Sequence, residues 1–193
     1  MTEQNKKQRA VVICPGRGTY NKEELGYFHR NHADKTSLLN VIDAHRESKG
    51  QPTVASLDSM ESYSMKTHTA GENASSLIYA CAHGDFHSID QDKYDIVAVT
   101  GNSMGWYIAL AVAGALNNYG AFELINTMGS MMTKGVIGGQ LIYPIVDQHW
   151  QKDVAREKMV LDLVEQVNQD SDCQVYVSIY IGGYIVLGGD NKG

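Results

Sequence analysis

A serine lies between two glycines in the segment Gly101-Asn102-Ser103-Met104-Gly105. This is the G-x-S-x-G pattern, in which a sharp turn between a strand and a helix exposes the serine hydroxyl as a nucleophile. Glycines on either side let neighbouring backbone pass close by. The N–H of the next residue, Met104, then points at the oxyanion that forms during acyl transfer. The pattern predicts Ser103 as a nucleophile; the alternative is a glycine-rich turn whose serine only caps the helix.

A second glycine loop, Pro15-Gly16-Arg17-Gly18, follows an earlier apolar run. It lacks the spacing of both the Walker phosphate loop and the dinucleotide-binding G-x-G-x-x-G pattern. One interpretation is the other half of an oxyanion hole, with the Arg17 N–H as donor. The other is a plain turn, which is favoured when the loop is considered alone.

The elements around these loops are typical of an α/β domain. Residues 10–14 are a short β-branched run that predicts a buried strand, and 94–100 are of the kind found in strands buried on both faces. Residues 106–116 form an apolar helix pattern, and 50–72 show no clear periodicity. Further helices are predicted over 22–31, 35–47, 74–82 and 120–133. We therefore expect a hydrolase-like, mainly parallel sheet with helices over residues 10–136.

The last third of the chain, residues 137–193, has a different order of elements. Strands are predicted over 140–146, 174–180 and 184–187, and a helix over 153–168. Gly182-Gly183 is a two-residue hairpin turn, and Val175, Val177 and Ile179 are predicted on one strand face. Strand, helix, strand, strand are the first four elements of a ferredoxin-like lobe, so the lobe is expected to be incomplete. Gly188-Gly189-Asp190-Asn191 suits the loop and N-cap of a further helix.

The composition restricts the possible partners. The 193 residues are 43% hydrophobic and 20% charged, which favours a packed core over disorder. The balance of 16 Lys+Arg against 22 Asp+Glu gives a net charge of -6, which argues against nucleic acid and against an anionic membrane surface. The longest apolar stretch, 106–116, is too short to span a membrane. We expect a cytoplasmic protein.

Cysteines and histidines suggest no metal centre. Cys14, Cys81 and Cys173 are odd in number and far apart, which predicts neither a disulfide framework nor a structural zinc site. His83 and His87 have helical i, i+4 spacing, but a third ligand is not evident. We interpret this pair, and His29 and His32, as surface or capping histidines, and expect no metal.

Together the two loops resemble those of a known family. A P-G-x-G loop after the first strand, followed about 85 residues later by G-x-S-x-G, is similar to the layout of malonyl-CoA:acyl-carrier-protein transacylases. The acyltransferase domains of polyketide and fatty acid synthases share this layout. The segments 109–124 and 174–189 also resemble that family, so the likeness covers most of residues 10–190.

The resemblance implies acyl transfer in fatty acid or polyketide synthesis. Ser103 would take the acyl group from a coenzyme A thioester, and the phosphopantetheine thiol of an acyl carrier protein would collect it. Arg17 and Met104 would supply the oxyanion N–H groups. Gly16, Asn102, Trp106 and Met128 would lie around the substrate. Coenzyme A enters as a substrate, and no permanently bound cofactor is implied.

Three departures from the family limit what can be transferred. The residue before the serine is Asn102 where the family usually has histidine. Met128 stands where malonyl-specific members carry an arginine, and a thioether cannot pair with a carboxylate. An uncharged acyl group therefore becomes more plausible than malonyl. The family's catalytic histidine follows the small lobe and has no counterpart here, so we expect a fragment, the front two-thirds of a transacylase, with a shortened inactive homologue as the alternative.

Two other functions remain open. An α/β-hydrolase-type serine esterase would need an acid and a histidine after Ser103, and its candidates are Glu123 or Asp147 with His149. Asp147 lies two residues from His149, which is a poor spacing for a triad. A non-catalytic module that binds an acyl carrier or a partner subunit is the third hypothesis.

Overall fold

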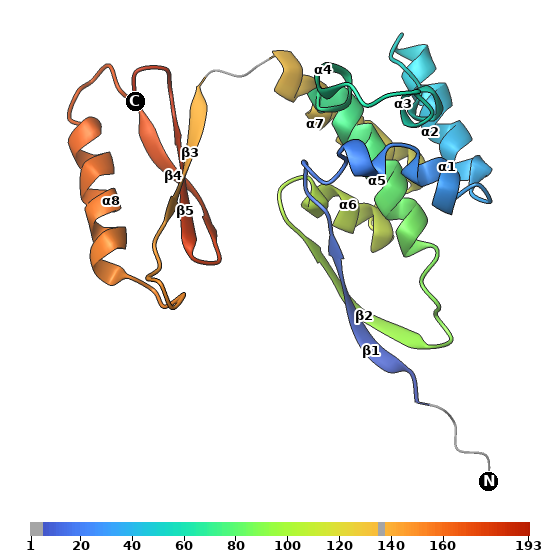
Figure 1. Ribbon diagram of the computed structural model, residues 1–193, viewed down its shortest axis with the longest axis horizontal. Coiled ribbons are helices and arrows are strands. Elements are labelled where there is room, and N and C mark those ends of the chain that lie inside the picture. The colour runs from blue at the N-terminus through green and yellow to red at the C-terminus, as the bar shows by residue number, and fades with distance from the viewer. Residues whose placement is uncertain (1–5, 135–137) are drawn as a thin grey trace. The chain divides into compact units, whose positions relative to one another are not determined.

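The computed structural model describes residues 6–134 and 138–193. The chain divides into two compact units, Met1–Lys134 and Gly135–Gly193, which are treated separately below. Figure 1 labels the helices and strands of both units. Among the described residues, no helix combines the length and apolar character that crossing a membrane requires.

The first unit contains a two-stranded parallel sheet and a group of helices (Figure 1). Strand β1, Gln8–Cys14, pairs along its length with β2, Tyr94–Gly101. The helices are α1 (Tyr27–Asn31), α2 (Thr36–Ser48), α3 (Val54–Asp58), α4 (Met65–His68), α5 (Gly71–Phe86), α6 (Gly105–Val112) and α7 (Asn118–Lys134), with a 3₁₀ turn at Lys22–Glu24.

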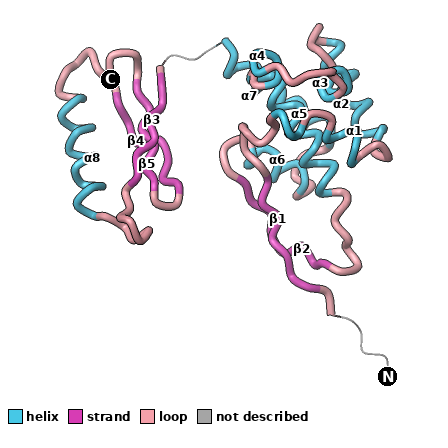
Figure 2. The backbone as a smooth tube through the Cα atoms, in the orientation of Figure 1, coloured by secondary structure: helices cyan, strands magenta, loops and turns pink. Residues whose placement is uncertain are grey.

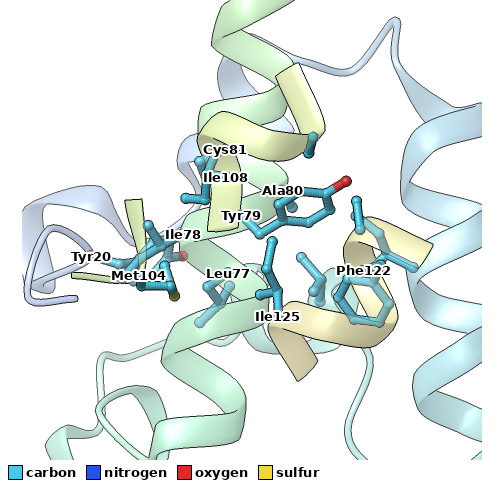
Figure 3. Close-up of a cluster of buried hydrophobic side chains, with 14 of the residues drawn as sticks. Tyr20, Leu77, Ile78, Tyr79, Ala80, Cys81, Met104, Ile108, Phe122 and Ile125 are labelled. Carbon is cyan, nitrogen blue, oxygen red and sulfur yellow. The ribbon is translucent and has the colours of Figure 1, made fainter. Parts of the chain in front are cut away.

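Helix α5 lies at the centre of the core of this unit. Leu77, Tyr79 and Ala80 are fully buried, and side chains from α6 and α7 pack beside them (Figure 3). Tyr20 and Met104, from the two glycine loops, belong to the same cluster. Burial of these two apolar side chains therefore anchors both loops to the core, and apolar burial is the main favourable term in folding.

Several helix boundaries differ from the sequence prediction. The helix predicted over 22–31 is interrupted at Gly26, whose φ of 80° is left-handed, and α1 begins after it. Helix α6 ends at Val112 rather than at residue 116, and Gly114 follows with a φ of 73°. The aperiodic stretch 50–72 holds the two short helices α3 and α4, each capped by a hydroxyl, Thr53 and Ser64.

The sheet is less covered than expected. The strand at 10–14 was predicted to be buried, but Val11 and Ile13 are 56% and 74% exposed. The strand at 94–100 was predicted to be buried on both faces, but Val97 is 41% exposed. Val12 and Val99 pack against the core on the other face. The prediction of two buried faces is wrong for the described residues, because only one face of this two-stranded sheet meets the helices. The larger hydrolase-like sheet is not confirmed; the structure shows a mixed α/β fold with small sheets.

The second unit is a three-stranded antiparallel sheet with one helix (Figure 2). The order of strands is β3-β5-β4, formed by Gly139–Pro144, Tyr184–Gly189 and Val175–Ile181. Helix α8, Val154–Val167, packs Val160 and Leu161 against the sheet. Gly182 and Gly183 have φ values of 27° and 99°, as a tight hairpin turn requires. The order strand, helix, strand, strand agrees with the sequence prediction.

One face assignment in this unit is wrong. Val175 and Val177 lie opposite Gly189 and Leu187, but a bulge follows Val177. Ile179 is therefore opposite Val186, the neighbour of Leu187 in β5. Because successive residues of a strand point to opposite faces, Ile179 does not share a face with Val177.

A buried arginine ties three helices of the first unit together. Arg46 of α2 is fully buried, and its guanidinium donates to oxygen acceptors on the segments around it. Nη1 lies 2.6 Å from Ser76 Oγ and 3.1 Å from Asn126 Oδ1, and Nη2 lies 2.6 Å from Asn73 Oδ1. Further bonds reach the carbonyl oxygens of Glu72 and Pro52. The charge is thus compensated by α5 and α7 through neutral acceptors.

Candidate active site

The parallel pairing of β1 and β2 places the two glycine loops side by side. Cys14 and Gly101 form the last pair of the ladder, so both loops leave the same end of the sheet. A Cβ on Gly16 would lie 2.9 Å from the Asn102 carbonyl oxygen and 3.6 Å from Ser103 Cβ. A side chain at position 16 would therefore collide with the turn that carries Ser103. The structure brings Gly16, Asn102 and Ser103 together, from positions 86 or more residues apart in the sequence.

Ser103 has the backbone conformation of a strained turn. Its φ of 54° is left-handed, which is unusual for a residue with a Cβ and costs roughly 1–2 kcal/mol. The residue is exposed and lies between the end of β2 and the start of α6. Within residues 6–134 and 138–193, its hydroxyl has no hydrogen-bond partner. The side chain is thus presented to solvent.

The flanking glycines are required by close backbone contacts. A Cβ on Gly101 would lie 2.2 Å from the carbonyl carbon of Gly105, and a Cβ on Gly105 would lie 2.3 Å from the Cys14 carbonyl oxygen. Both contacts involve backbone rather than a flexible side chain. The turn therefore has no room for alanine at either position.

We expect Gly105→Ala to destabilise the first unit by about 2 kcal/mol or more, because β1 and α6 would have to move apart. Urea unfolding measures the change. Gly139→Ala is the matched control, since a Cβ there meets nothing within 4 Å. Equal midpoints for the two variants would contradict the close contact at Gly105.

Two backbone N–H groups near Ser103 are free to donate. In the described part of the chain, neither the Met104 N–H nor the Arg17 N–H has a hydrogen-bond partner. Met104 precedes the first residue of α6, where helical dipoles concentrate about half a positive charge. The Met104 side chain is buried, whereas Arg17 is exposed. Unpaired backbone N–H groups can stabilise a developing oxyanion, whatever side chain the residue carries.

The remaining predicted site residues differ in their positions. Asn102 is exposed, and its carbonyl oxygen accepts from the Gly105 N–H at 2.8 Å, which closes the turn. Trp106 is 57% exposed on the first turn of α6, and its N–H donates to the Ser103 carbonyl oxygen. Met128 lies half-buried on α7, and no described contact joins it to the Ser103 turn.

The acids required by the esterase hypothesis have other partners. The Glu123 carboxylate lies 2.9 Å from Lys49 Nζ and 2.7 Å from His45 Nε2. The Asp147 carboxylate accepts from the backbone N–H of His149, at 2.8 Å, and not from its imidazole. The structure therefore does not show Asp147–His149 as a dyad, and Glu123 is paired with basic side chains of its own unit.

His83 is not the surface or capping residue that we expected. It is 3% exposed in α5, while His87 is the C-cap of the same helix. Their rings lie 4.5 Å apart, and the described residues contain no group of three or more metal-ligating side chains. Burial, and secondarily the charge of His87, lowers the pKa of His83 from 6.5 to about 4. His32 is likewise buried, with its Nε2 2.9 Å from Asp85.

The lowered pKa of His83 predicts a loss of stability in acid. The unfolded chain binds a proton at His83 below pH 6.5 and the folded chain only near pH 4, so stability falls as pH drops between these values. Carboxylates also titrate there, so the test compares wild type with His83→Gln in urea at pH 7 and pH 5. We expect wild type to lose more stability than the variant. An equal loss would contradict a neutral buried His83.

The sequence analysis did not identify the buried pair Tyr20 and Asp58, which follows the Arg17 loop in the structure. The Tyr20 hydroxyl donates to Asp58 Oδ1 at 2.5 Å, and both residues are at least 95% buried. Asp58 lies in the stretch 50–72, which showed no periodicity. A buried carboxylate inside a polar, aperiodic segment leaves no sequence signal beyond its residue type.

Comparisons with known proteins give matches among solved structures. No protein-family model and no curated protein matches the chain. A malonyl CoA-acyl carrier protein transacylase from Clostridium perfringens is 18% identical, with a TM-score of 0.70, over 95% of this chain and 54% of that one. An acyl carrier protein S-malonyltransferase from Vibrio cholerae is 19% identical, with a TM-score of 0.70, over 96% of this chain and 56% of that one. A loading acyltransferase from the avermectin modular polyketide synthase is 15% identical, with a TM-score of 0.65, over 96% of this chain and 55% of that one.

These matches establish the fold. The predicted resemblance to malonyl-CoA:acyl-carrier-protein transacylases and acyltransferase domains is confirmed at the level of structure. The chain spans about half the length of the solved structures that it matches, rather than the expected two-thirds.

Proposed function

We propose that this chain carries the nucleophile of an acyltransferase, which moves an acyl group from coenzyme A to an acyl carrier protein. One observation carries the proposal: Ser103 has a left-handed φ between a strand and a helix, directly beside the Gly16 loop. This geometry supports a nucleophile elbow at Ser103, for which we propose the N–H groups of Arg17 and Met104 as oxyanion donors. The fold, which solved transacylases share, supports the same reaction class.

The reaction proceeds in two steps at Ser103. The hydroxyl oxygen attacks the thioester carbonyl and loses its proton to a base, and the N–H groups of Arg17 and Met104 stabilise the oxyanion. The C–S bond then breaks, and coenzyme A leaves as a thiol after taking up the proton. In the second step the phosphopantetheine thiol of the carrier attacks the serine ester, and Ser103 recovers its proton.

The base that takes the Ser103 proton is the remaining group of the site. We propose that it is a histidine, as the resemblance to the transacylase family implies. No described side chain engages the Ser103 hydroxyl, so no described histidine is assigned this role. The oxyanion donors and the nucleophile are the groups that we assign to this chain.

The proposed acyl group is uncharged, such as acetyl or a longer chain. Met128 offers a thioether at the position where an arginine would pair with a malonyl carboxylate, and Asn102 and Trp106 add no positive charge. Trp106 contributes apolar surface close to Ser103. Gly16 allows the acyl group to approach without a side chain in its way.

The proposed setting is cytoplasmic fatty acid or polyketide synthesis. The thioester of coenzyme A is the substrate, and the acyl carrier protein is the partner; we propose no resident cofactor or metal. Three cysteines without a disulfide are suited to a reducing compartment.

Transfer of radiolabelled acetyl and malonyl groups from coenzyme A to an acyl carrier protein tests this function. We expect the chain to accelerate acetyl transfer even without an assigned base, because an oxyanion hole and substrate binding alone can retain roughly 10³–10⁴-fold catalysis. We also expect it to favour acetyl over malonyl. Rates equal to those without the chain would contradict the proposal, and a preference for malonyl would contradict the role of Met128.

A further inference from the structure

The loop that follows β1 is held to the core at Tyr20. Two side-chain hydrogen bonds are internal to the loop: Thr19 Oγ1 donates to the Gly16 carbonyl oxygen at 3.1 Å, and Asn21 Nδ2 donates to that of Gly18. From outside it, the Tyr63 hydroxyl donates to the Tyr20 carbonyl oxygen at 3.5 Å. Tyr20 instead points inward and is 4% exposed. Its ring is grouped with Ile78 of α5 and with Met104 (Figure 3). Tyr20 and Met104, the residue that follows Ser103, thus belong to one buried cluster.

Asp58 is the acceptor at the end of this anchor. The carboxylate is 1% exposed and lies at the end of α3. Oδ1 accepts from the Tyr20 hydroxyl at 2.5 Å, and Oδ2 accepts from the His29 N–H at 3.0 Å. His29 Nδ1 lies 2.6 Å from Oδ2, but that side chain is 45% exposed. Hydrogen bonds to a buried charge are short and roughly twice as strong as neutral ones.

We infer that Asp58 is a positioning residue for the loop that carries the Arg17 N–H, and that it acts through Tyr20. The Tyr20–Asp58 bond fixes the loop three residues from the Arg17 N–H, and that N–H must point at the carbonyl that Ser103 attacks. The inference rests on the proposed acyl transfer. Its physical content, a loop whose order depends on one buried hydrogen bond, can be measured without any activity.

The structure separates this role from general stability. Asp58 holds α1 through the backbone N–H of His29 and through its imidazole, and holds the loop through Tyr20. Loss of the His29 side chain should disturb α1 and leave the loop in place. Tyr27, which begins α1, has its hydroxyl 3.0 Å from exposed Asp85, and is a matched tyrosine with no contact to Asp58.

The test combines ¹⁵N order parameters of the backbone with acylation of Ser103, in Tyr20→Phe, Tyr27→Phe and His29→Ala. For Tyr20→Phe we expect the order parameters of residues 16–19 to fall from about 0.85, typical of rigid backbone, to below about 0.6. Order parameters in α5 should not change. The rate constant for acylation should fall with little change in the KM for acyl-CoA. Tyr27→Phe and His29→Ala should leave loop order parameters and acylation as in wild type.

Unchanged order parameters of the loop in Tyr20→Phe would overturn the inference, as would an equal fall in His29→Ala. If Tyr20→Phe does not fold, Asp58→Asn provides a second comparison, because it keeps the shape and removes the charge. If wild type takes up no acyl group, the proposed function fails, while the order parameters still decide whether Asp58 orders the loop.

Discussion

Ser103→Gly is expected to abolish uptake of an acyl group and to raise the stability of the first unit by about 1 kcal/mol. The loss of acylation follows because no other described hydroxyl occupies the turn between β2 and α6. The gain in stability follows because glycine adopts the left-handed φ of 54° without the strain that a Cβ imposes. Acyl-CoA incubation followed by intact-mass measurement, and urea unfolding, test the two effects.

Ser103→Ala separates strain from chemistry. It removes the hydroxyl but keeps the Cβ, so acylation should be lost with the unfolding midpoint close to that of wild type. Trp150→Gly is the control in the second unit. It also replaces a residue with a left-handed φ, here 57°, but it leaves Ser103 intact. Acylation that persists in Ser103→Gly would mean that the nucleophile lies elsewhere.

Arg46→Met is expected to destabilise the first unit by at least about 3 kcal/mol. Methionine fills most of the volume of the side chain but cannot donate, so buried acceptors on Asn73, Ser76 and Asn126 lose their partner. Each unsatisfied buried group costs about 1–3 kcal/mol. Guanidinium unfolding measures the change; failure to recover folded protein is the extreme form of the same result.

Arg30→Met is the matched control for Arg46. Arg30 is exposed and its guanidinium bonds to the Leu25 carbonyl oxygen. Exposed substitutions of this kind usually change stability by less than about 0.5 kcal/mol. If the two variants unfolded at the same denaturant concentration, the buried network would contribute nothing.

The predictable parts of the fold come from local patterns. Strands with β-branched residues, the helix after Ser103 and the Gly182-Gly183 hairpin are encoded within a few residues each. The G-x-S-x-G and P-G-x-G segments predict where two turns occur. Their contact, Gly16 against Ser103, depends on the parallel register of β1 and β2, which the family resemblance implied but local patterns could not.

The parts that failed depend on tertiary packing. Ile179 changes face because of a bulge, and β1 exposes Ile13 because no described element covers that face. His83 was predicted at the surface or as a cap, yet it is buried, which its neutral form permits. The helix predicted over 74–82 extends over Gly71–Phe86 and includes Gly84, where a Cβ would lie 2.6 Å from the His32 ring.

The central claim is that Ser103 accepts an acyl group. The most direct measurement is peptide mass spectrometry after incubation of the chain with acetyl-CoA, which locates any added acyl group. The account predicts one acetyl ester, on the peptide that contains Ser103, and its removal by a phosphopantetheine thiol. An acetyl group on another residue, or a Ser103 peptide of unchanged mass, would contradict the claim.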